Sequence, residues 1–380
     1  MRSPCSKFAV RLSLRLTITA TVALAAMLAS SAGASANNFS PIGCKPNPNG
    51  HGPRFCPTVN YSPKTLDDNK DNTFNQLLGI NMQGKIAGYF GSGLQGHPNK
   101  GYMLSPPYSQ NKFRDLNFPN STQTQVTGTN DNGVRVGFWS AMNNAGTNQV
   151  NDQHGWYVLN GKFVQADFPT QNPFNPPMDQ LLGVNNHNVA VGFWTDADQN
   201  AHGYTYDIDN KSFNSVAVPD ATSATATAIN DNGDIAGFGT FNNVTKAWVR
   251  LADNGGQVGT LSFPGADSTQ ILGFNNSRGA VGVYTMGTAL HGFTWSAITG
   301  FRTVDAPQGQ GTTTLNGTNA CGDIVGFYVD PNTGFTHGLL LNANFSKFSS
   351  AVIGQAADAF TAKKHKKRIK KIKTKLPKGC

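Results

Sequence analysis

Histidine is the first residue type in this sequence whose placement could support chemistry, because its side chain can bind a metal ion or move a proton. Four His-Gly pairs recur at equivalent places along the body of the chain, each followed by an aromatic or apolar residue. They begin at His154, His202, His291 and His337. Equivalent positions of separate repeats lie too far apart to share one ion unless they line a common axis. We therefore predict that these histidines make a structural contact that holds each repeat together.

A second candidate is a cation site in a short acidic segment. Asp196, Asp198 and Asn200 have the alternate spacing of oxygen ligands in a calcium loop, and segment 207–210 is similar. The glycine at the sixth position of such a loop and the glutamate at its twelfth are both missing. The segment therefore predicts a solvated turn, with calcium binding as the alternative. We expect no other cofactor.

Motifs of known enzymes are missing from the sequence. It contains no Gly-x-Ser-x-Gly, no His-Glu-x-x-His and no phosphate-binding loop. Arg135 and Arg278 are charged at repeat positions that are otherwise uncharged, which makes them candidates for binding an anion. A pair of carboxylates inside an axial channel stays open as a catalytic alternative, because neighbours in space need not be neighbours in sequence.

These residues belong to a unit that occurs six times. Each copy has a small residue, any residue and Asn, then Gly seven positions after that Asn, usually followed by an aromatic residue. The Asn residues are Asn81, Asn130, Asn185, Asn230, Asn275 and Asn319. Asn-Asp-Asn-Gly in two copies supplies residues that tolerate positive φ in a tight turn. We predict a turn at each Asn and a strand after it.

Three further strands are expected in each unit. The apolar runs Ile86–Phe90 and Val189–Trp194 represent the first strand, whose invariant glycine indicates that another backbone approaches closely. The second begins at the His-Gly pair, the third runs from an aromatic or Leu to a Pro, and the fourth is a Thr-rich run. Within the first strand, Phe138-Trp139 and Phe193-Trp194 are predicted to pack between repeats rather than stack on a sugar.

Composition and repeat length together predict an all-β protein. The chain of 380 residues contains 42 Gly, 20 Pro and 40 Asn, which weaken helix interiors, while its 24 Phe provide apolar area to bury. Four short strands every 44 to 55 residues is the size of a β-propeller blade. We predict a six-bladed propeller over residues 58–350, closed by a blade with half from each end of the chain. An open β-solenoid is the alternative.

The repeats resemble the HAF-type extracellular repeat family, named for a His-Ala-Phe-like motif that the His-Gly-aromatic strands match. The resemblance covers about residues 58–342 and rests on the repeat length and the Gly-x-Asn turn. It implies export and a repeated β-fold, and no assigned reaction. Two copies have Lys100 and Lys246 in place of the His, and two have Asn188 and Arg278 in place of the turn glycine.

The N-terminal segment has the pattern of an export signal. Residues 1–36 contain a basic start, an apolar run over 16–28 and the small residues Ala34-Ser35-Ala36 at the expected cleavage site. The apolar run is too short to span a bilayer. We therefore expect export to the periplasm, cell surface or medium, with a Pro/Gly-rich segment 37–57 preceding the propeller. In an oxidising compartment, Cys44, Cys56, Cys321 and Cys380 predict two disulfides, whose pairing the sequence leaves open.

The C-terminal segment 351–380 is the most strongly basic part of the chain. The net charge of the whole chain is +9, but the signal contributes four basic residues and segment 363–378 contributes ten with no acid. The rest has 16 basic against 21 acidic residues. The candidate anion-binding residues of the tail include Lys363, Lys364, Lys366, Lys367, Arg368, Lys370 and Lys371. Such a tail favours an anionic lipid, polysaccharide or nucleic acid as its partner, with a solvated disordered tail as the alternative.

These observations predict an exported, monomeric, non-catalytic binding or scaffold module. Its tail would attach to an anionic polymer or membrane surface, and the rim of the propeller would bind a protein or glycan. The alternatives are a propeller hydrolase or lyase with an axial metal or carboxylate site, and a glycan-binding module that uses rim aromatics.

Overall fold

The computed structural model describes residues 59–94, 96–141, 152–175 and 177–345. Within these residues the chain forms strands and two short 3-10 helices, η1 (Gln110–Lys112) and η2 (Ala252–Asn254), and no α-helix. No helix in this part is long and apolar enough to cross a bilayer. The prediction of an all-β protein is confirmed. The predicted signal segment, segment 37–57 and the basic tail lie outside the described residues.

Most strands form antiparallel meanders of four. The first sheet contains β2 (Asn75–Ile80), β3 (Ile86–Phe90), β4 (Lys100–Leu104) and β5 (Phe113–Asp115). The second contains β6 (Gln123–Thr129), β7 (Arg135–Ser140), β8 (His154–Leu159) and β9 (Lys162–Gln165). A third such sheet contains β18 (Ser268–Phe274), β19 (Ala280–Met286), β20 (Ala289–Ser296) and β21 (Gly300–Thr303).

An eight-stranded sheet lies between the second and third of these. Its strands are β10 (Asp179–Val184), β11 (Val189–Thr195), β12 (Ala201–Asp207), β13 (Ser212–Ser215), β14 (Ser223–Ile229), β15 (Ile235–Phe241), β16 (Val244–Arg250) and β17 (Val258–Leu261). Strands β10–β13 and β14–β17 are separate antiparallel meanders. A single parallel pair, His202 with Ala224, joins β12 to β14. The eight strands therefore consist of two four-stranded units joined by a single bridge pair.

The remaining sheet joins the two ends of the described chain. It contains β22 (Thr313–Thr318), β23 (Ile324–Val329), β24 (Thr336–Phe345) and β1 (Val59–Thr65), in the order β1-β24-β23-β22. Strands β1 and β24 pair from Val59↔Phe345 to Thr65↔Leu339. The expectation of equal halves was wrong, because one strand comes from the start of the chain and three from its end. The Thr-rich run before each Asn turn is the innermost strand of the next sheet, which shifts the division by one strand.

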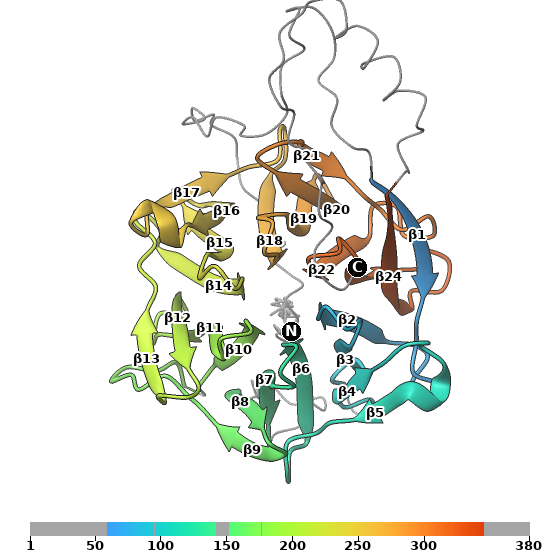
Figure 1. Ribbon diagram of the computed structural model, residues 1–380, viewed down its shortest axis with the longest axis horizontal. Coiled ribbons are helices and arrows are strands. Elements are labelled where there is room, and N and C mark those ends of the chain that lie inside the picture. Colours follow the sequence, from blue (N-terminus) through green and yellow to red (C-terminus); the bar gives the residue numbers. More distant parts are fainter. Residues whose placement is uncertain (1–58, 95, 142–151, 176, 346–380) are drawn as a thin grey trace, which may run out of the picture.

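The sheets surround a common centre, as in a β-propeller (Figure 1). The first strand of each meander lies innermost, and each inner strand contacts the inner strand of the next meander around the ring. The inner strands are β2, β6, β10, β14, β18 and β22. The outer strands are shorter than the segments predicted for them, because residues such as 116–119 and 166–169 form the connections to the next sheet.

The recurring glycine of the second strand is explained by its neighbours. A Cβ atom on Gly192 would collide with the carbonyl oxygen of Gln180 on the inner strand β10, and one on Gly282 would collide with that of Gln270. The same clash occurs in the other units, and several of these glycines also lie beneath an aromatic ring of the third strand, as Gly137 does beneath Trp156. The predicted close approach of another backbone is confirmed.

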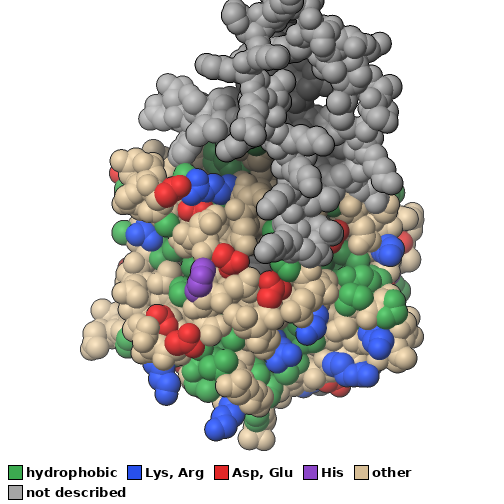
Figure 2. All heavy atoms as spheres, viewed as in Figure 1, with side chains coloured by type: hydrophobic (Ala, Val, Ile, Leu, Met, Phe, Trp, Pro, Cys, Tyr) green, Lys and Arg blue, Asp and Glu red, His purple; other side chains and the backbone are tan. Residues whose placement is uncertain are grey.

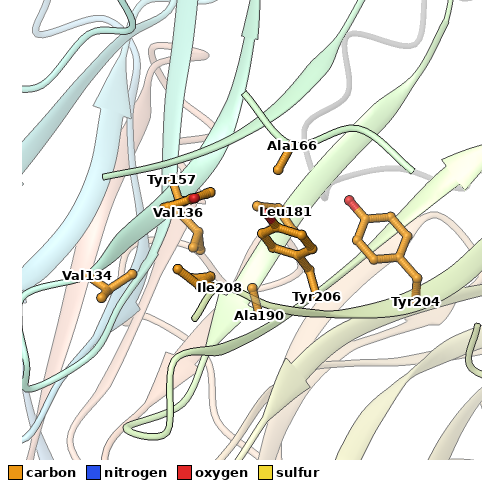
Figure 3. Packing of buried hydrophobic residues seen from close by; sticks show 9 residues of the cluster. All are labelled: Val134, Val136, Tyr157, Ala166, Leu181, Ala190, Tyr204, Tyr206 and Ile208. Carbon is orange, nitrogen blue, oxygen red and sulfur yellow. The ribbon is translucent and has the colours of Figure 1, made fainter. Parts of the chain in front are cut away.

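Apolar side chains fill the space between neighbouring sheets. One cluster joins Val136 and Tyr157 of the second sheet to Leu181, Ala190 and Tyr204 of the next (Figure 3). All five are at most 3% exposed. Burying such side chains stabilises the fold by about 1.5–3 kcal/mol each. Side chains between the sheets therefore hold the ring together and position the turns at its two ends.

Candidate functional site

The Asn of each repeat closes its own turn. In the turn after β10, the side-chain Oδ1 of Asn185 accepts hydrogen bonds from the backbone N–H groups of His187 and Val189, both at 3.0 Å. Asn81, Asn230 and Asn275 each accept the same two bonds in their own turns. A short amide side chain can satisfy the turn backbone in this way. The predicted turns are confirmed.

The same Asn side chains link the turns into a closed ring. The Nδ2 of Asn81 donates to the backbone carbonyl of Asn130 at 3.1 Å, and each Asn donates likewise to the next. The remaining distances, in chain order, are 2.9, 3.1, 3.2 and 3.0 Å. Asn319 completes the circle by donating to the carbonyl of Asn81 at 3.3 Å. This invariant side chain is therefore used entirely for structure.

A second set of polar side chains follows the first around the axis. It comprises Asp131, Asn186, Asp231 and Asn276, each directly after a ring asparagine. Each accepts the backbone N–H of the corresponding residue in the preceding turn, from Met82 N–H on Asp131 to Asp231 N–H on Asn276. The Asn186 and Asn276 amides also donate to the Asp231 carboxylate. Sequence reasoning missed this set, although its position after each Asn was a readable signal.

Arg278 is held by two carboxylates in the preceding repeat. Its guanidinium bonds Asp234 at 2.8 and 3.2 Å and Asp253 at 2.7 Å. Burial alone would raise the pKa of Asp234, but the bonds from Arg278, Asn230 and the Ala252 N–H lower it below its usual value. The same carboxylates raise the pKa of Arg278. The anionic partner predicted for Arg278 is therefore a pair of carboxylates of the protein itself.

Arg135 occupies a position where the other repeats place a buried apolar residue such as Ile86 or Ile235. Its Nε is buried and has no hydrogen-bond partner among the described residues. The structure does not bring Arg135 and Arg278 together, since they belong to different sheets. On the face shown in Figure 2, acidic and basic side chains are scattered among uncharged atoms instead of forming one charged patch.

Three of the repeated histidines form the same contact. The Nδ1 atoms of His154, His291 and His337 lie 2.8, 2.7 and 2.7 Å from carboxylate oxygens of Asp167, Asp305 and Asp67. The second oxygen of each aspartate accepts the N–H of the glycine that follows the histidine, at 2.9–3.0 Å. Each pair ties the third strand to the segment that leads into the next sheet. This supports the structural role predicted for the histidines.

His154 carries an additional charge partner. The hydrogen bond to Asp167 raises the pKa of His154, burial opposes the shift, and the charge of Asp152 supports it. His202 differs from the other three because its Nε2 lies 2.7 Å from Asp196 in the turn before its own strand. The repeated histidines therefore have charged partners, but not identical ones.

The tryptophans beside these histidines each contact a phenylalanine ring and a histidine ring. Trp139 stacks on Phe118 at 4.6 Å between ring centroids, and His154 lies 5.1 Å from its ring. Trp194 lies between Phe168 at 5.7 Å and His202 at 4.5 Å. Sugar recognition by stacking needs an open ring face. These contacts support the packing role predicted for the two tryptophans.

Asp179 is a buried carboxyl group that sequence reasoning did not select. It lies on β10, where Tyr204 donates to its Oδ1 at 2.5 Å and the Phe168 N–H donates to its Oδ2 at 2.7 Å. Burial, reinforced by the charge of Asp167, raises the pKa of Asp179 to about 8, although these two hydrogen bonds act in the opposite direction. Thr124 and Thr269 accept the equivalent backbone N–H in other repeats. Asp179 therefore replaces a structural threonine.

The calcium candidates lie in a hydrogen-bonded turn. The Oδ1 of Asp196 accepts the N–H groups of Asp198 and Asn200 at 3.0 and 2.9 Å, and its Oδ2 contacts His202. Segment 207–210 forms a similar turn around Asp207. Across the described ranges, no group of three or more His, Cys, Asp or Glu side chains is placed to hold a metal ion. This geometry favours the turn, and calcium binding stays a prediction.

Several candidates cannot be placed. Cys321 lies in the turn after β22, whereas Cys44, Cys56 and Cys380 lie outside the described residues, so the disulfides stay predictions. The basic residues of the tail, from Lys363 to Lys371, also lie outside. The loop over 141–153, which lengthens the second repeat and belongs to the rim predicted to bind a partner, is described only at its two ends, so this prediction stays untested.

Comparisons with known proteins give only weak likenesses. No protein-family model matches this chain, and no curated protein matches it. A putative TolB from Agrobacterium tumefaciens is 11% identical with a TM-score of 0.49, over 76% of this chain and 99% of that one. TolB from Acinetobacter baumannii is 14% identical with a TM-score of 0.44, over 62% of this chain and 54% of the TolB chain. This chain therefore spans about half the length of that TolB. The SapL1 lectin, solved with alpha methyl fucoside, is 9% identical with a TM-score of 0.47, over 72% of this chain and 94% of that one. These likenesses assign neither a family nor a function.

Proposed function

We propose that this protein is an exported, monomeric, six-bladed propeller that acts as a non-catalytic binding or scaffold module. The count of six treats β10–β13 and β14–β17 as separate blades, because only one residue pair joins them. The six asparagine turns, whose hydrogen bonds return to Asn81, support the same count. The predicted signal over residues 1–36 supports export to the periplasm, cell surface or medium. We also propose membership of the HAF-type extracellular repeat family.

One observation carries the non-catalytic assignment. The repeated polar side chains that could do chemistry make internal bonds: the asparagines bond the next turn, and His154, His291 and His337 bond aspartates. The one carboxylate on an inner strand, Asp179, is buried between sheets rather than exposed on the axis. No observation on the described residues favours the axial enzyme or the aromatic glycan site over a binding scaffold.

In this proposal the tail over 351–380 attaches the propeller to an anionic polymer or membrane, while the rim or an axial end binds a protein or small ligand. Ten Lys and Arg within segment 363–378 support the attachment, because each basic residue near an anionic lipid surface contributes about 1 kcal/mol. Salt should weaken the attachment strongly.

The test compares three forms of the mature chain on heparin and on vesicles of phosphatidylserine and phosphatidylcholine. The forms are the full chain, a deletion of 363–380, and a chain whose tail Lys and Arg are replaced by Gln. Of these three forms, we expect only the full chain to be retained in low salt. A scrambled tail with the same charge should still bind. Equal retention of the full chain and the deletion would refute the attachment.

A further inference from the structure

The polar set around the axis leaves one gap. Backbone N–H groups of Met82, Asp131, Asn186 and Asp231 each donate to a side-chain oxygen of the next turn, at 2.8–2.9 Å. The acceptors alternate between carboxylate and amide oxygens. A carboxylate or amide oxygen is therefore the acceptor that bonds the N–H group at this position of the ring.

Two successive turns lack the acceptor. The equivalent N–H groups belong to Asn276 and Ala320, and neither makes a hydrogen bond in the described part of the chain. The cause lies in the side chains: Ala320 has no oxygen to offer Asn276, and Met82 has none to offer Ala320. The ring of asparagine bonds continues through both places, from Asn275 to Asn319 and on to Asn81. The backbone is therefore held as in the other turns, and only the acceptor is missing.

We propose that this gap binds the carboxylate group of a small organic acid or of an acidic group on a partner. Its oxygens would accept the Asn276 and Ala320 N–H groups, as Asp131 and Asp231 accept those of Met82 and Asn186. The apolar part of the ligand would contact Met82 and the Ala320 methyl group. The proposal rests on the proposed function as a binding module and names the chemical group that the module recognises.

The charges around the gap are consistent with weak binding. Asp231, the carboxylate in the neighbouring turn, is bonded by the amides of Asn186 and Asn276. Asp323, in the turn of Ala320, accepts bonds from Asn319 and from the Ala343 N–H on β24. The positive charge of Arg278 is shared by Asp234 and Asp253. Two backbone N–H groups without a cationic side chain of their own predict weak binding.

The test is an amide chemical-shift titration of the full mature chain, labelled with ¹⁵N. Acetate and N-acetylglycine should shift the Asn276 and Ala320 amide signals saturably, whereas chloride at equal ionic strength should not. In Ala320→Asn, the new amide oxygen should cap the Asn276 N–H without adding charge, and the Asn276 response should fall at least tenfold. Asn already occupies this position in two other turns, so the variant should fold.

The matched control is Ser277→Asn, at the next position of the turn. Asn132 and Asn232 occupy that position in other repeats and donate to a carbonyl rather than accept an N–H. This variant should keep the full response. Equal shifts in chloride and acetate, or an unchanged Asn276 response in Ala320→Asn, would overturn the proposal. Neither result would affect retention by the tail, so this proposal and tail attachment can fail separately.

Discussion

Replacing Asp179 by Asn should change how the stability of the protein depends on pH. Asp179 is 4% exposed, and its carboxyl group accepts hydrogen bonds from Tyr204 of β12 and from the Phe168 N–H. Besides Tyr204, the charged and titratable groups that act on it are Asp167 and His154, which form an ion pair with each other. An Asn at this place can still accept the Phe168 N–H and can donate to the Tyr204 oxygen. The substitution therefore removes the ionisation and keeps the contacts.

The magnitude follows from the shift. The pKa of Asp179 is about 8 in the folded protein against an ordinary value of 3.8, a rise of about 4 units. Between these values the folded state holds a proton that the unfolded chain has released, so stability falls as pH rises. At about 1.4 kcal/mol per unit, the loss between pH 4 and pH 8 reaches at most about 6 kcal/mol. Above pH 8 the loss is complete and the dependence levels off.

Urea unfolding of the natural chain and of Asp179→Asn at pH 5, 6.5 and 8 measures this difference. We expect the smallest difference at pH 5 and a variant more stable by several kcal/mol at pH 8. Asp207→Asn is the control of opposite sign, because bonds from Asn210 lower the pKa of Asp207 and its loss should not stabilise the fold at pH 8. Parallel pH curves for the natural chain and Asp179→Asn would refute the reasoning.

Two further substitutions test the ring. Asn185→Ala removes the buried bond to the Asn230 carbonyl and the partly buried bonds from the His187 and Val189 N–H groups. It should lower the free energy of unfolding by about 2–4 kcal/mol, since losing the buried bond costs about 1–3 kcal/mol and each partly buried bond about 0.5 kcal/mol. A loss below about 0.5 kcal/mol in urea unfolding would contradict the role of the ring. Gly192→Ala places a methyl group against the Gln180 carbonyl and should lower the free energy of unfolding by about 3 kcal/mol or more. Urea unfolding measures this loss, and an unchanged midpoint would show that β10 and β11 can separate without penalty.

The turns and glycines were predictable because their requirements are local. A left-handed backbone at the fourth turn position demands Gly or a residue that tolerates positive φ, and the structure has φ of 86° at Gly133, 57° at Asn188 and 59° at Arg278. The departures noted in the sequence therefore keep the conformation that the other copies obtain with glycine. Likewise, a missing Cβ on the second strand is visible in each copy of the repeat.

Contacts between sheets were much harder to predict. The burial of Asp179 depends on Phe168 and Tyr204 in neighbouring segments, and nothing in the residues around 179 separates it from an ordinary polar position. The partners of two histidines were easier to predict, because Asp167 and Asp305 follow His154 and His291 by only 13 and 14 residues. Asp67 was harder to predict as the partner of His337, since it precedes His337 by 270 residues and contacts it only because β1 pairs with β24.

The pairing of β1 with β24 also places the two ends of the described chain side by side. The first described residue, Val59, lies opposite the last, Phe345, on the outermost pair of strands (Figure 1). The segments before 59 and after 345 therefore leave the ring from one place on its perimeter. The tail attachment proposed above would therefore act on the propeller from its perimeter, at the pair β1 and β24.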